Sequence, residues 1–277
     1  MSQPLYASVI AIALAGFSAV TLAEADKKQP GRTALSAAEQ SAPNREAEEA
    51  QLRAAIEKGA TMQEIAQLRD PVAKTPEEAI RALKTGNSRF FGGQARRPEL
   101  SANERRAQIL AQTPFAAILG CADSRAPIEL VYDQGLGDLF SVRVAGNVAD
   151  PSTLGSVEYA VMHLKTKLVV VMGHEGCGAV KAAMLPEAAR KGEPENVQYL
   201  LNQIVPSVEK IPELRDSKAR MREAVIANVR QQVQKAKENP TIKAALDKKQ
   251  IAVIGAFYEI SSGQVDFLET EDELRVN

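Results

Sequence analysis

The sequence predicts an α/β domain in which a mostly parallel central sheet with an antiparallel edge strand is flanked by helices. The first reason is that short, continuous apolar runs alternate with longer helical stretches along the chain. Such runs are typical of strands that are buried on both faces of a parallel sheet. The second reason is that the last apolar run follows its predecessor after a short turn containing glycine, which predicts a hairpin and hence an antiparallel edge. Strands and helices in repeated order indicate a layered architecture.

The main domain is predicted to begin at Thr75. Threonine is a frequent N-cap, Pro76 suits the first helical position, and the two glutamates that follow complement the positive helix N-terminus. From there the predicted strands cover residues 115–119, 139–144, 168–172, 251–257 and 265–268, and the predicted helices cover residues 153–164, 179–189, 196–208 and 217–238. We therefore assign residues 75–277 to this domain.

The first 25 residues are interpreted as a signal peptide. Residues 5–23 are almost wholly apolar or small, and Ala23-Glu24-Ala25 is a plausible cleavage pattern. No lysine or arginine precedes the apolar run, so an uncleaved anchor and a buried helix stay open as alternatives. The segment contains no cysteine, which excludes a lipoprotein anchor there. We expect a periplasmic or secreted protein without a stable membrane span after cleavage.

Residues 26–74 are predicted to form a polar, partly helical linker or arm. The stretch is rich in Ala, Glu, Gln and Arg and contains few large apolar residues. Asn44 is a suitable N-cap for a helix over residues 45–58, and a second short helix is predicted after Thr61, through residue 68. This arm could pad the domain, swap onto a neighbouring subunit or act as a tether.

The composition favours a small-molecule partner over nucleic acid. Hydrophobic residues make up 45% of the chain and charged residues 25%, which is ordinary for a globular protein with a sizeable core. The 34 basic and 35 acidic residues give a formal net charge of -1, so the sequence lacks the positive charge that binding to nucleic acid requires. Aromatic residues are only 4% and tryptophan is absent, which leaves little for stacking on bases.

Both cysteines of the chain lie beside other residue types that ligate metals. Cys121 opens the run C-A-D-S-R after the first predicted strand, and His174 and Cys177 belong to the run H-E-G-C after the third. Because ligands gather at the carboxyl ends of strands in open α/β sheets, the two runs can converge. Two thiolates and an imidazole suit zinc, and three protein ligands leave a fourth position open, as in catalytic zinc sites. The alternatives are a disulfide between the cysteines and two inert core thiols.

Asp123 and Arg125 are candidate catalytic residues. They lie two positions apart, so in an extended segment their side chains point the same way as that of Cys121. They can form a charge-assisted pair that holds a metal-bound hydroxide toward a substrate. The alternative is a surface ion pair that contributes little to stability.

Three further residues near these runs are assigned provisional roles. His163, the other histidine, ends a predicted helix, where a structural or capping role is favoured over proton transfer. Gly173 and Gly178 bracket the second ligand run, which suggests that the backbone crowds the metal there. We assign Gly178 to substrate binding.

Five motifs together resemble those of the β-class carbonic anhydrases. They are C-A-D-S-R at Cys121, R-V-A-G-N at Arg143, T-L-G-S-V-E-Y-A at Thr153, G-H-E-G-C-G-A at Gly173 and G-A-F-Y-E-I-S-S-G at Gly255. The resemblance runs from about residue 75 to the C-terminus and includes N-S-R-F at Asn87. The first seventy-odd residues lie outside it.

This resemblance implies one Zn²⁺ per chain, held by Cys121, His174 and Cys177, with water or Asp123 as fourth ligand. In that family the aspartate moves between the zinc and an arginine, so Asp123 and Arg125 would form an activating dyad that opens at raised pH. The resemblance also implies an α/β sheet with an antiparallel edge strand, and a homodimer or dimer of dimers with active sites near the subunit interface. Some members place a glutamine at the substrate site, but here the register puts a glycine, residue 135, at that position.

We expect zinc-dependent, reversible hydration of CO2 to bicarbonate and a proton. Zinc lowers the pKa of its bound water to about 7, and the resulting hydroxide attacks a small electrophilic carbon. Two thiolates donate more charge than imidazoles would, which predicts a less acidic water and an alkaline optimum. The alternatives are a COS or CS2 hydrolase on the same scaffold and a zinc-binding or bicarbonate-binding protein without turnover, against which the intact aspartate–arginine pair argues.

Overall fold

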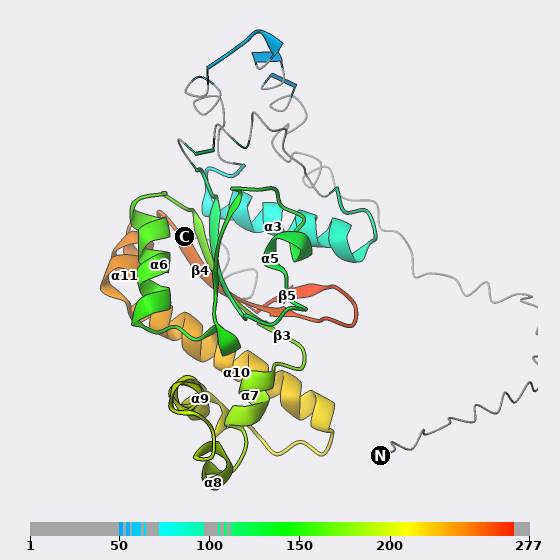
Figure 1. Cartoon of the computed structure of the whole chain (residues 1–277), viewed down its shortest axis with the longest axis vertical. Helices are drawn as coiled ribbons and strands as arrows, with labels where there is room; N and C mark the ends of the chain where they lie inside the picture. The colour runs from blue at the N-terminus through cyan, green and yellow to red at the C-terminus, as the bar shows by residue number, and fades with distance from the viewer. Residues whose placement is uncertain are drawn as a thin grey trace, which may run out of the picture. The chain divides into compact units, whose positions relative to one another are not determined.

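The computed structural model describes residues 72–96 and 112–268, together with scattered residues between 50 and 64 and between 105 and 109. In these residues a five-stranded sheet lies between two layers of helices (Figure 1). The strand order is β2-β1-β3-β4-β5. Neighbouring strands are parallel except for β4 and β5, which pair antiparallel at the edge. The predicted fold class is confirmed.

The sheet consists of β1 (Ala116–Gly120), β2 (Leu139–Arg143), β3 (Leu168–His174), β4 (Ala252–Tyr258) and β5 (Val265–Phe267). Every position of β1, β3 and β4 is buried, as expected for continuous apolar runs inside a parallel sheet. The register sets Gly120 of β1 opposite Met172 of β3. Cys121 therefore leaves the sheet within two residues of His174, and both ligand runs lie at the same carboxyl edge.

Helices cover both faces of the sheet. On one face, α3 (Pro76–Phe91) and the short α5 (Ile128–Val131) pack over apolar side chains of the strands. The other face carries α6 (Pro151–Met162), α7 (Gly178–Ala183), α9 (Glu195–Val208), α10 (Ser217–Glu238) and α11 (Pro240–Asp247). Two short elements complete the connections, the 3₁₀ turn η1 (Ala145–Asn147) after β2 and α8 (Glu187–Arg190) after α7. The long helix α10 lies across β3 and β4.

Most predicted helices are present, with one correction and two omissions. The single helix predicted over residues 179–189 is wrong, because Pro186 takes an extended conformation (φ −54°, ψ 148°) and separates α7 from α8. The short α5 and the longer α11 were not predicted. The start of α11 carries a recognisable signal, since the Asn239 side chain accepts the N–H groups of Thr241 and Ile242 and Pro240 occupies the first position.

Asn87 connects the first helix of the domain to the last hairpin. Its side chain is buried, and its Nδ2 donates to the carbonyl oxygens of Val131 at 3.0 Å and Gly263 at 2.9 Å. Its Oδ1 accepts the N–H of Val265 at 2.9 Å. One amide on α3 therefore holds the end of α5 and the turn that leads into β5, and the amide itself is satisfied although it is buried.

The N-terminal predictions are tested only in part. Five described residues between 50 and 57 are helical, in agreement with the helix predicted there. Thr61 and Glu64 form a capping box, in which Thr61 Oγ1 accepts the Glu64 N–H at 3.3 Å and the Glu64 carboxylate accepts the Thr61 N–H at 2.8 Å. The predicted signal peptide lies outside the described residues, so it stays a prediction, as does the division of the chain into three segments. No helix in the described part of the chain is long and apolar enough to cross a membrane.

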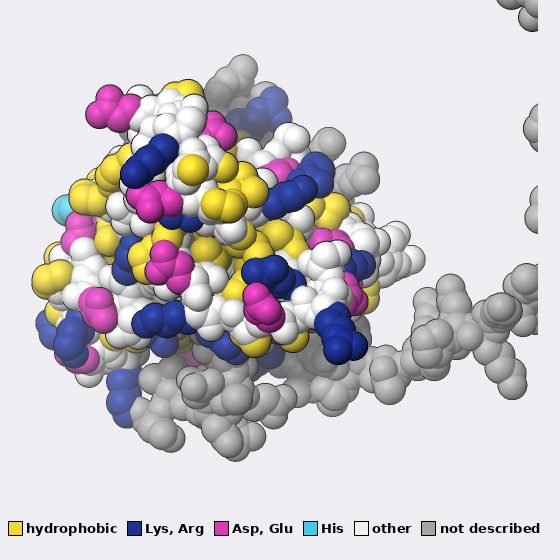
Figure 2. Space-filling view, turned by 90° about the horizontal axis from the view of Figure 1, so that it is seen from below, with side chains coloured by type: hydrophobic (Ala, Val, Ile, Leu, Met, Phe, Trp, Pro, Cys, Tyr) yellow, Lys and Arg dark blue, Asp and Glu magenta, His cyan; other side chains and the backbone are white. Residues whose placement is uncertain are grey.

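Charges of both signs are interspersed on the face that Figure 2 shows. Hydrophobic side chains lie between them, and among the described residues of this face neither sign gathers into a continuous field. This distribution agrees with the formal net charge of -1. A basic stripe, which is the usual footprint of a nucleic-acid-binding surface, is not seen on this part of the molecule.

We expect substitution by alanine to change stability in opposite directions at two helical glycines. A Cβ on Gly86 in α3 would lie 1.8 Å from the carbonyl oxygen of Tyr132, whereas a Cβ on Gly155 in α6 would meet no heavy atom within 4 Å. We expect Gly86→Ala to lower the free energy of unfolding by about 2 kcal/mol, because the backbone must move. We expect Gly155→Ala to raise it by about 0.5–1 kcal/mol, because alanine loses less backbone entropy in a helix. Chemical denaturation measures both, and equal changes in the two variants would contradict this account.

Candidate metal centre

The structure brings the two predicted ligand runs together at the carboxyl edge of the sheet. Cys121 directly follows β1, His174 is the last residue of β3, and Cys177 directly precedes α7. One ligand atom of each residue lies within 4.8 Å of the other two, and all three side chains are buried. Residues 121, 174 and 177 therefore form a candidate metal centre with three donors.

His174 presents its Nε2 atom to this centre. The side chain is fully buried, and the Nδ1–H donates to the carbonyl oxygen of Glu175 at 3.0 Å. The Nε2 lone pair then has no hydrogen-bond partner among the residues that the structure describes. A buried polar atom without a partner is costly, and ligation of a metal ion would satisfy it. Histidines that ligate metals commonly donate their other N–H to a backbone carbonyl in this way.

The turn between His174 and Cys177 depends on Gly176. Its φ of +66° is in the left-handed region that favours glycine. The turn lets the imidazole and the second thiol both face Cys121. The N–H of Glu175 donates to the carbonyl of Tyr258 at 2.8 Å, which fastens this loop to the end of β4.

The two thiols contact one another and shift each other's pKa in opposite directions. Their sulfur atoms lie 4.0 Å apart, about twice the length of a disulfide bond, and both cysteines are free. The hydrogen bond from Cys177 lowers the pKa of Cys121 to about 4, and the same contact raises the pKa of Cys177. Burial acts to lower the pKa of His174, but the interaction with Cys121 outweighs it and raises that pKa. A divalent cation would balance the charge of this pocket and replace the shared protons.

Backbone and arginine contacts hold Cys121 in place. The N–H of Gly146 in η1 donates to Cys121 Sγ at 3.4 Å. Arg143 at the end of β2 donates from Nε to the Cys121 carbonyl at 3.0 Å and from Nη2 to the Asp123 carbonyl at 2.7 Å. From the sequence, Gly146 is predicted only as a turn or close-packing position, and no contact with Cys121 is predicted for it or for Arg143. The R-V-A-G-N motif contained both, but a backbone N–H directed at a sulfur depends on loop geometry that residue types do not reveal.

Asp123 and Arg125 form the predicted pair beside the three donors. Asp123 Oδ1 accepts the backbone N–H and the Nε–H of Arg125, each at 2.9 Å, and Oδ2 accepts from Nη2 at 2.8 Å. These hydrogen bonds hold the pKa of Asp123 well below its usual range. Asp123 Oδ2 also lies 3.8 Å from His174 Nε2, yet Asp123 is not one of the three mutually close donors. In this structure the carboxylate is engaged with the arginine, and its roles as ligand and in catalysis stay predictions.

The other predicted residues lie around the centre in different ways. Gly178 begins α7, is exposed, and has open space where a side chain would be, while its assignment to substrate binding stays a prediction. Gly173 is packed closely against α10, because a Cβ there would lie 2.6 Å from both Val225 and Val229, while the crowding of a metal by its backbone stays a prediction. His163 caps the C-terminus of α6, as expected.

Gln134 and Gly135 form hydrogen bonds within their own turn. The sequence register puts Gly135 at the position where some β-class carbonic anhydrases have a substrate-site glutamine. Gln134 is buried, and its Nε2 donates to the carbonyl of Tyr132 at 2.8 Å. The N–H of Gly135 donates to Asp138 Oδ2 at 2.7 Å. These bonds shape the turn after α5.

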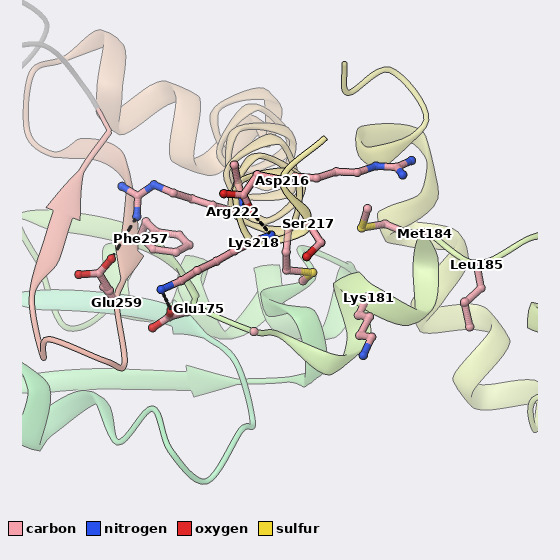
Figure 3. A pocket seen from close by; sticks show the side chains of 14 residues that line it. Glu175, Lys181, Met184, Leu185, Asp216, Ser217, Lys218, Arg222, Phe257 and Glu259 are labelled. Carbon is pink, nitrogen blue, oxygen red and sulfur yellow. Dashed lines mark hydrogen bonds and ion pairs between the residues drawn. The ribbon is translucent and has the colours of Figure 1, made fainter. Parts of the chain in front are cut away.

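A pocket of about 830 Å³ lies beside the second ligand run (Figure 3). Its walls include Glu175, Gly176, side chains of α7 and the first turns of α10. Lys218 reaches across it to Glu175, with Nζ 3.3 Å from Oε1. None of the three metal donors lines this pocket, so it is a neighbour of the metal centre and distinct from it.

Comparison with known proteins gives a consistent result. The family model described as carbonic anhydrase matches residues 116–265. The carbonic anhydrase of Mycolicibacterium smegmatis is 38% identical over 194 residues, which cover 69% of this chain and 92% of that protein. Carbonic anhydrase 2 of Mycobacterium tuberculosis is 37% identical over 190 residues, which cover 68% of this chain and 91% of that protein.

Solved structures agree with the sequence comparison. A tetrameric β-carbonic anhydrase from Sordaria macrospora superposes with a TM-score of 0.54 at 26% identity and covers 66% of this chain and 93% of that one. The Coccomyxa β-carbonic anhydrase in complex with acetazolamide gives a TM-score of 0.53 at 26% identity and covers 65% of this chain and 77% of that one. The similarity therefore spans most of each of these proteins and includes the sheet that positions the three donors.

Thiol chemistry should separate a metal-bound pair of cysteines from a disulfide. Because ligating thiolates are shielded from reagents, we expect the metal-loaded chain to react slowly with a thiol reagent, and two thiols per chain to react once a chelator removes the metal. Cys121→Ser is the control, in which the remaining thiol should react with or without chelator. Thiols that appear after reduction but not after chelation would show a disulfide and refute the metal centre.

Proposed function

The chain belongs to the β-class carbonic anhydrase family, and on this premise we propose that it catalyses the zinc-dependent, reversible hydration of CO2 to bicarbonate and a proton. The observation that carries the proposal is the buried donor set, in which one ligand atom of His174 lies within 4.8 Å of two cysteine sulfurs, and Nε2 has no hydrogen-bond partner in the described part of the chain. The substrate class is proposed from the two mycobacterial relatives, which are named carbonic anhydrases.

Cys121, His174 and Cys177 would hold one zinc ion per chain. Two thiolates and one imidazole suit zinc, and their negative charge offsets that of the ion. Bound there, zinc would lower the pKa of a water in its fourth position to about 7 and so supply hydroxide at neutral pH. The hydrogen bond from His174 Nδ1–H to the Glu175 carbonyl keeps the Nε2 lone pair directed at the centre.

Asp123 and Arg125 would keep the fourth position open and orient what occupies it. Asp123 Oδ2 lies 3.8 Å from His174 Nε2, so a hydrogen-bond acceptor stands beside the donors. Three hydrogen bonds from Arg125 hold this carboxylate away from direct ligation. If the pair opened, the carboxylate could itself become the fourth ligand and exclude water. Arg125 therefore supports the active arrangement, and the exposed Gly178 leaves room beside it for a small substrate.

We also propose that the chain forms a homodimer or a dimer of dimers and is periplasmic or secreted. Association is supported by half-exposed Tyr159 and Met162 on α6, which packs against the terminal strand β2. It is also supported by a solved relative that is described as tetrameric. Export is supported by the apolar segment and cleavage pattern within residues 1–25.

Replacing Asp123 should stop turnover without emptying the metal site. In Asp123→Ala the three donors remain, so we expect about one zinc per chain. We expect CO2 hydration to fall by about 10²- to 10⁴-fold, the usual cost of losing a positioned proton acceptor. Stopped-flow hydration with a pH indicator and metal analysis of the same sample measure both quantities.

His163→Gln is the matched control, because His163 caps α6 and is not one of the three donors. Its hydration rate should be unchanged, and a loss there would support proton transfer by this histidine. An unchanged rate in Asp123→Ala would remove the aspartate from the mechanism. Zinc in the unaltered chain without CO2 turnover at any pH would favour a COS or CS2 hydrolase or a binding protein.

Arg125 should set the pH range of the activity. Because its hydrogen bonds hold the pKa of Asp123 well below the usual range, Asp123 is ionised at neutral and alkaline pH, and its titration cannot cause a rise in rate there. In Arg125→Gln the released carboxylate would compete with water for the fourth position, and hydroxide displaces it better as the pH rises. We expect zinc to be retained and the midpoint of the rate–pH profile to rise by about one pH unit. One pH unit corresponds to about 1.4 kcal/mol, which is comparable with the loss of one charge-assisted hydrogen bond. A uniformly lower profile with the same midpoint would contradict this gating role.

A further inference from the structure

A chain of buried amides connects helix α10 to the loop that holds Cys121. Asn228 Nδ2 donates to the Gly146 carbonyl at 2.9 Å, and Asn228 Oδ1 accepts from Gln232 Nε2 at 2.9 Å. Gln232 Oε1 in turn accepts the N–H of Ala149 at 3.0 Å. Both amide side chains are fully buried. The loop after β2 is therefore fastened to one helix at two points.

Gly146, whose carbonyl accepts the hydrogen bond from Asn228, also contacts the sulfur of Cys121. Gly146 donates its N–H to Cys121 Sγ at 3.4 Å. Its φ is +68°, and the next residue, Asn147, has a φ of +46°. Two successive left-handed residues are uncommon and need support from their surroundings. A side chain at residue 146 would be strained at this φ, and its Cβ would lie 2.5 Å from Ile204 Cδ1.

The two amides differ from the other buried side chains of α10, which are apolar. Val225 and Val229 crowd Gly173 of β3, and Val233 packs at Gly255 of β4. Buried amides stabilise a core only when their hydrogen bonds are made. An apolar residue at position 228 would fill the core without leaving a polar group that needs a partner. The amides face the loop of the metal centre, and this indicates a role in its geometry.

Hydrogen bonds to a ligating sulfur change the charge that it donates to the metal. We propose that Asn228, supported by Gln232, is a positioning residue for the metal centre. By fixing the Gly146 carbonyl it holds the Gly146 N–H on Cys121 Sγ, and so it sets how tightly the ion is retained. The proposal rests on the metal site of the proposed function but not on turnover.

The test compares zinc release from the unaltered full chain and from Asn228→Leu in excess chromogenic chelator. Leucine is similar in size to asparagine and removes both hydrogen bonds. We expect release to be about tenfold faster, the lower end of the effect of residues that orient metal ligands. We also expect the sulfur-to-metal charge-transfer absorption of the cobalt-substituted protein to shift, which general destabilisation alone would not cause.

Val233→Ala is the matched control, because Val233 is buried on the same helix and packs at Gly255, away from Gly146. It should lower stability and leave zinc release and the cobalt spectrum unchanged. Gln232→Leu keeps the bond from Asn228 to Gly146 but removes its support, so a smaller change in the same direction is expected.

Unchanged release and an unchanged spectrum in Asn228→Leu would overturn the proposal. If that variant does not fold, Gln232→Leu decides, and release no faster than in Val233→Ala overturns it equally. Zinc analysis of the unaltered chain comes first, and an absence of bound zinc there would refute the proposed function itself. The two failures are therefore distinguishable.

Discussion

Two cysteine sulfurs 4.0 Å apart, beside a fully buried imidazole nitrogen without a partner, impose the main constraint on this molecule. Unbalanced charge and unpaired polar atoms are costly in a protein interior. All three side chains are buried. Their positions are fixed by the sheet and one helix, because Cys121 follows β1, His174 ends β3 and Cys177 directly precedes α7. A bound cation would resolve the conflict, and metal binding would then contribute directly to the stability of the folded state.

Adjacent strands divide the construction of this centre between them. Strand β1 leads into Cys121 and Asp123, its neighbour β3 supplies His174 and then Cys177, and its other neighbour β2 supplies Arg143 and the turn η1. Parallel pairing puts the three carboxyl ends at one edge in a fixed register. Short connections then suffice, and little backbone entropy is lost in ordering long loops. The precision of the centre is therefore a property of the sheet.

The strands and the ligands could be predicted from sequence because their signals are local. Continuous apolar runs gave β1 and β3, and two short motifs gave the donors. The failures are equally specific. Pro186, which separates α7 from α8, and the N-cap Asn239, which begins α11, are local signals that the prediction lacks. The hydrogen bond from Gly146 to Cys121 and the amide chain through Asn228 join residues far apart in sequence, and they depend on a left-handed turn that no residue pattern specifies. The cause of the glycine at position 173 also lay in a distant helix.

The contacts of Asn87 have a consequence for biosynthesis. Its amide joins α3, among the first described elements of the domain, to the turn before β5, the last one. While a ribosome still holds the C-terminal hairpin, this buried amide lacks two of its three bonds and the sheet lacks an edge strand. A nascent chain therefore cannot complete this network until residues 263–265 have left the ribosome. Until that point β4 is the edge of the sheet, and the backbone groups that would pair with β5 are unpaired.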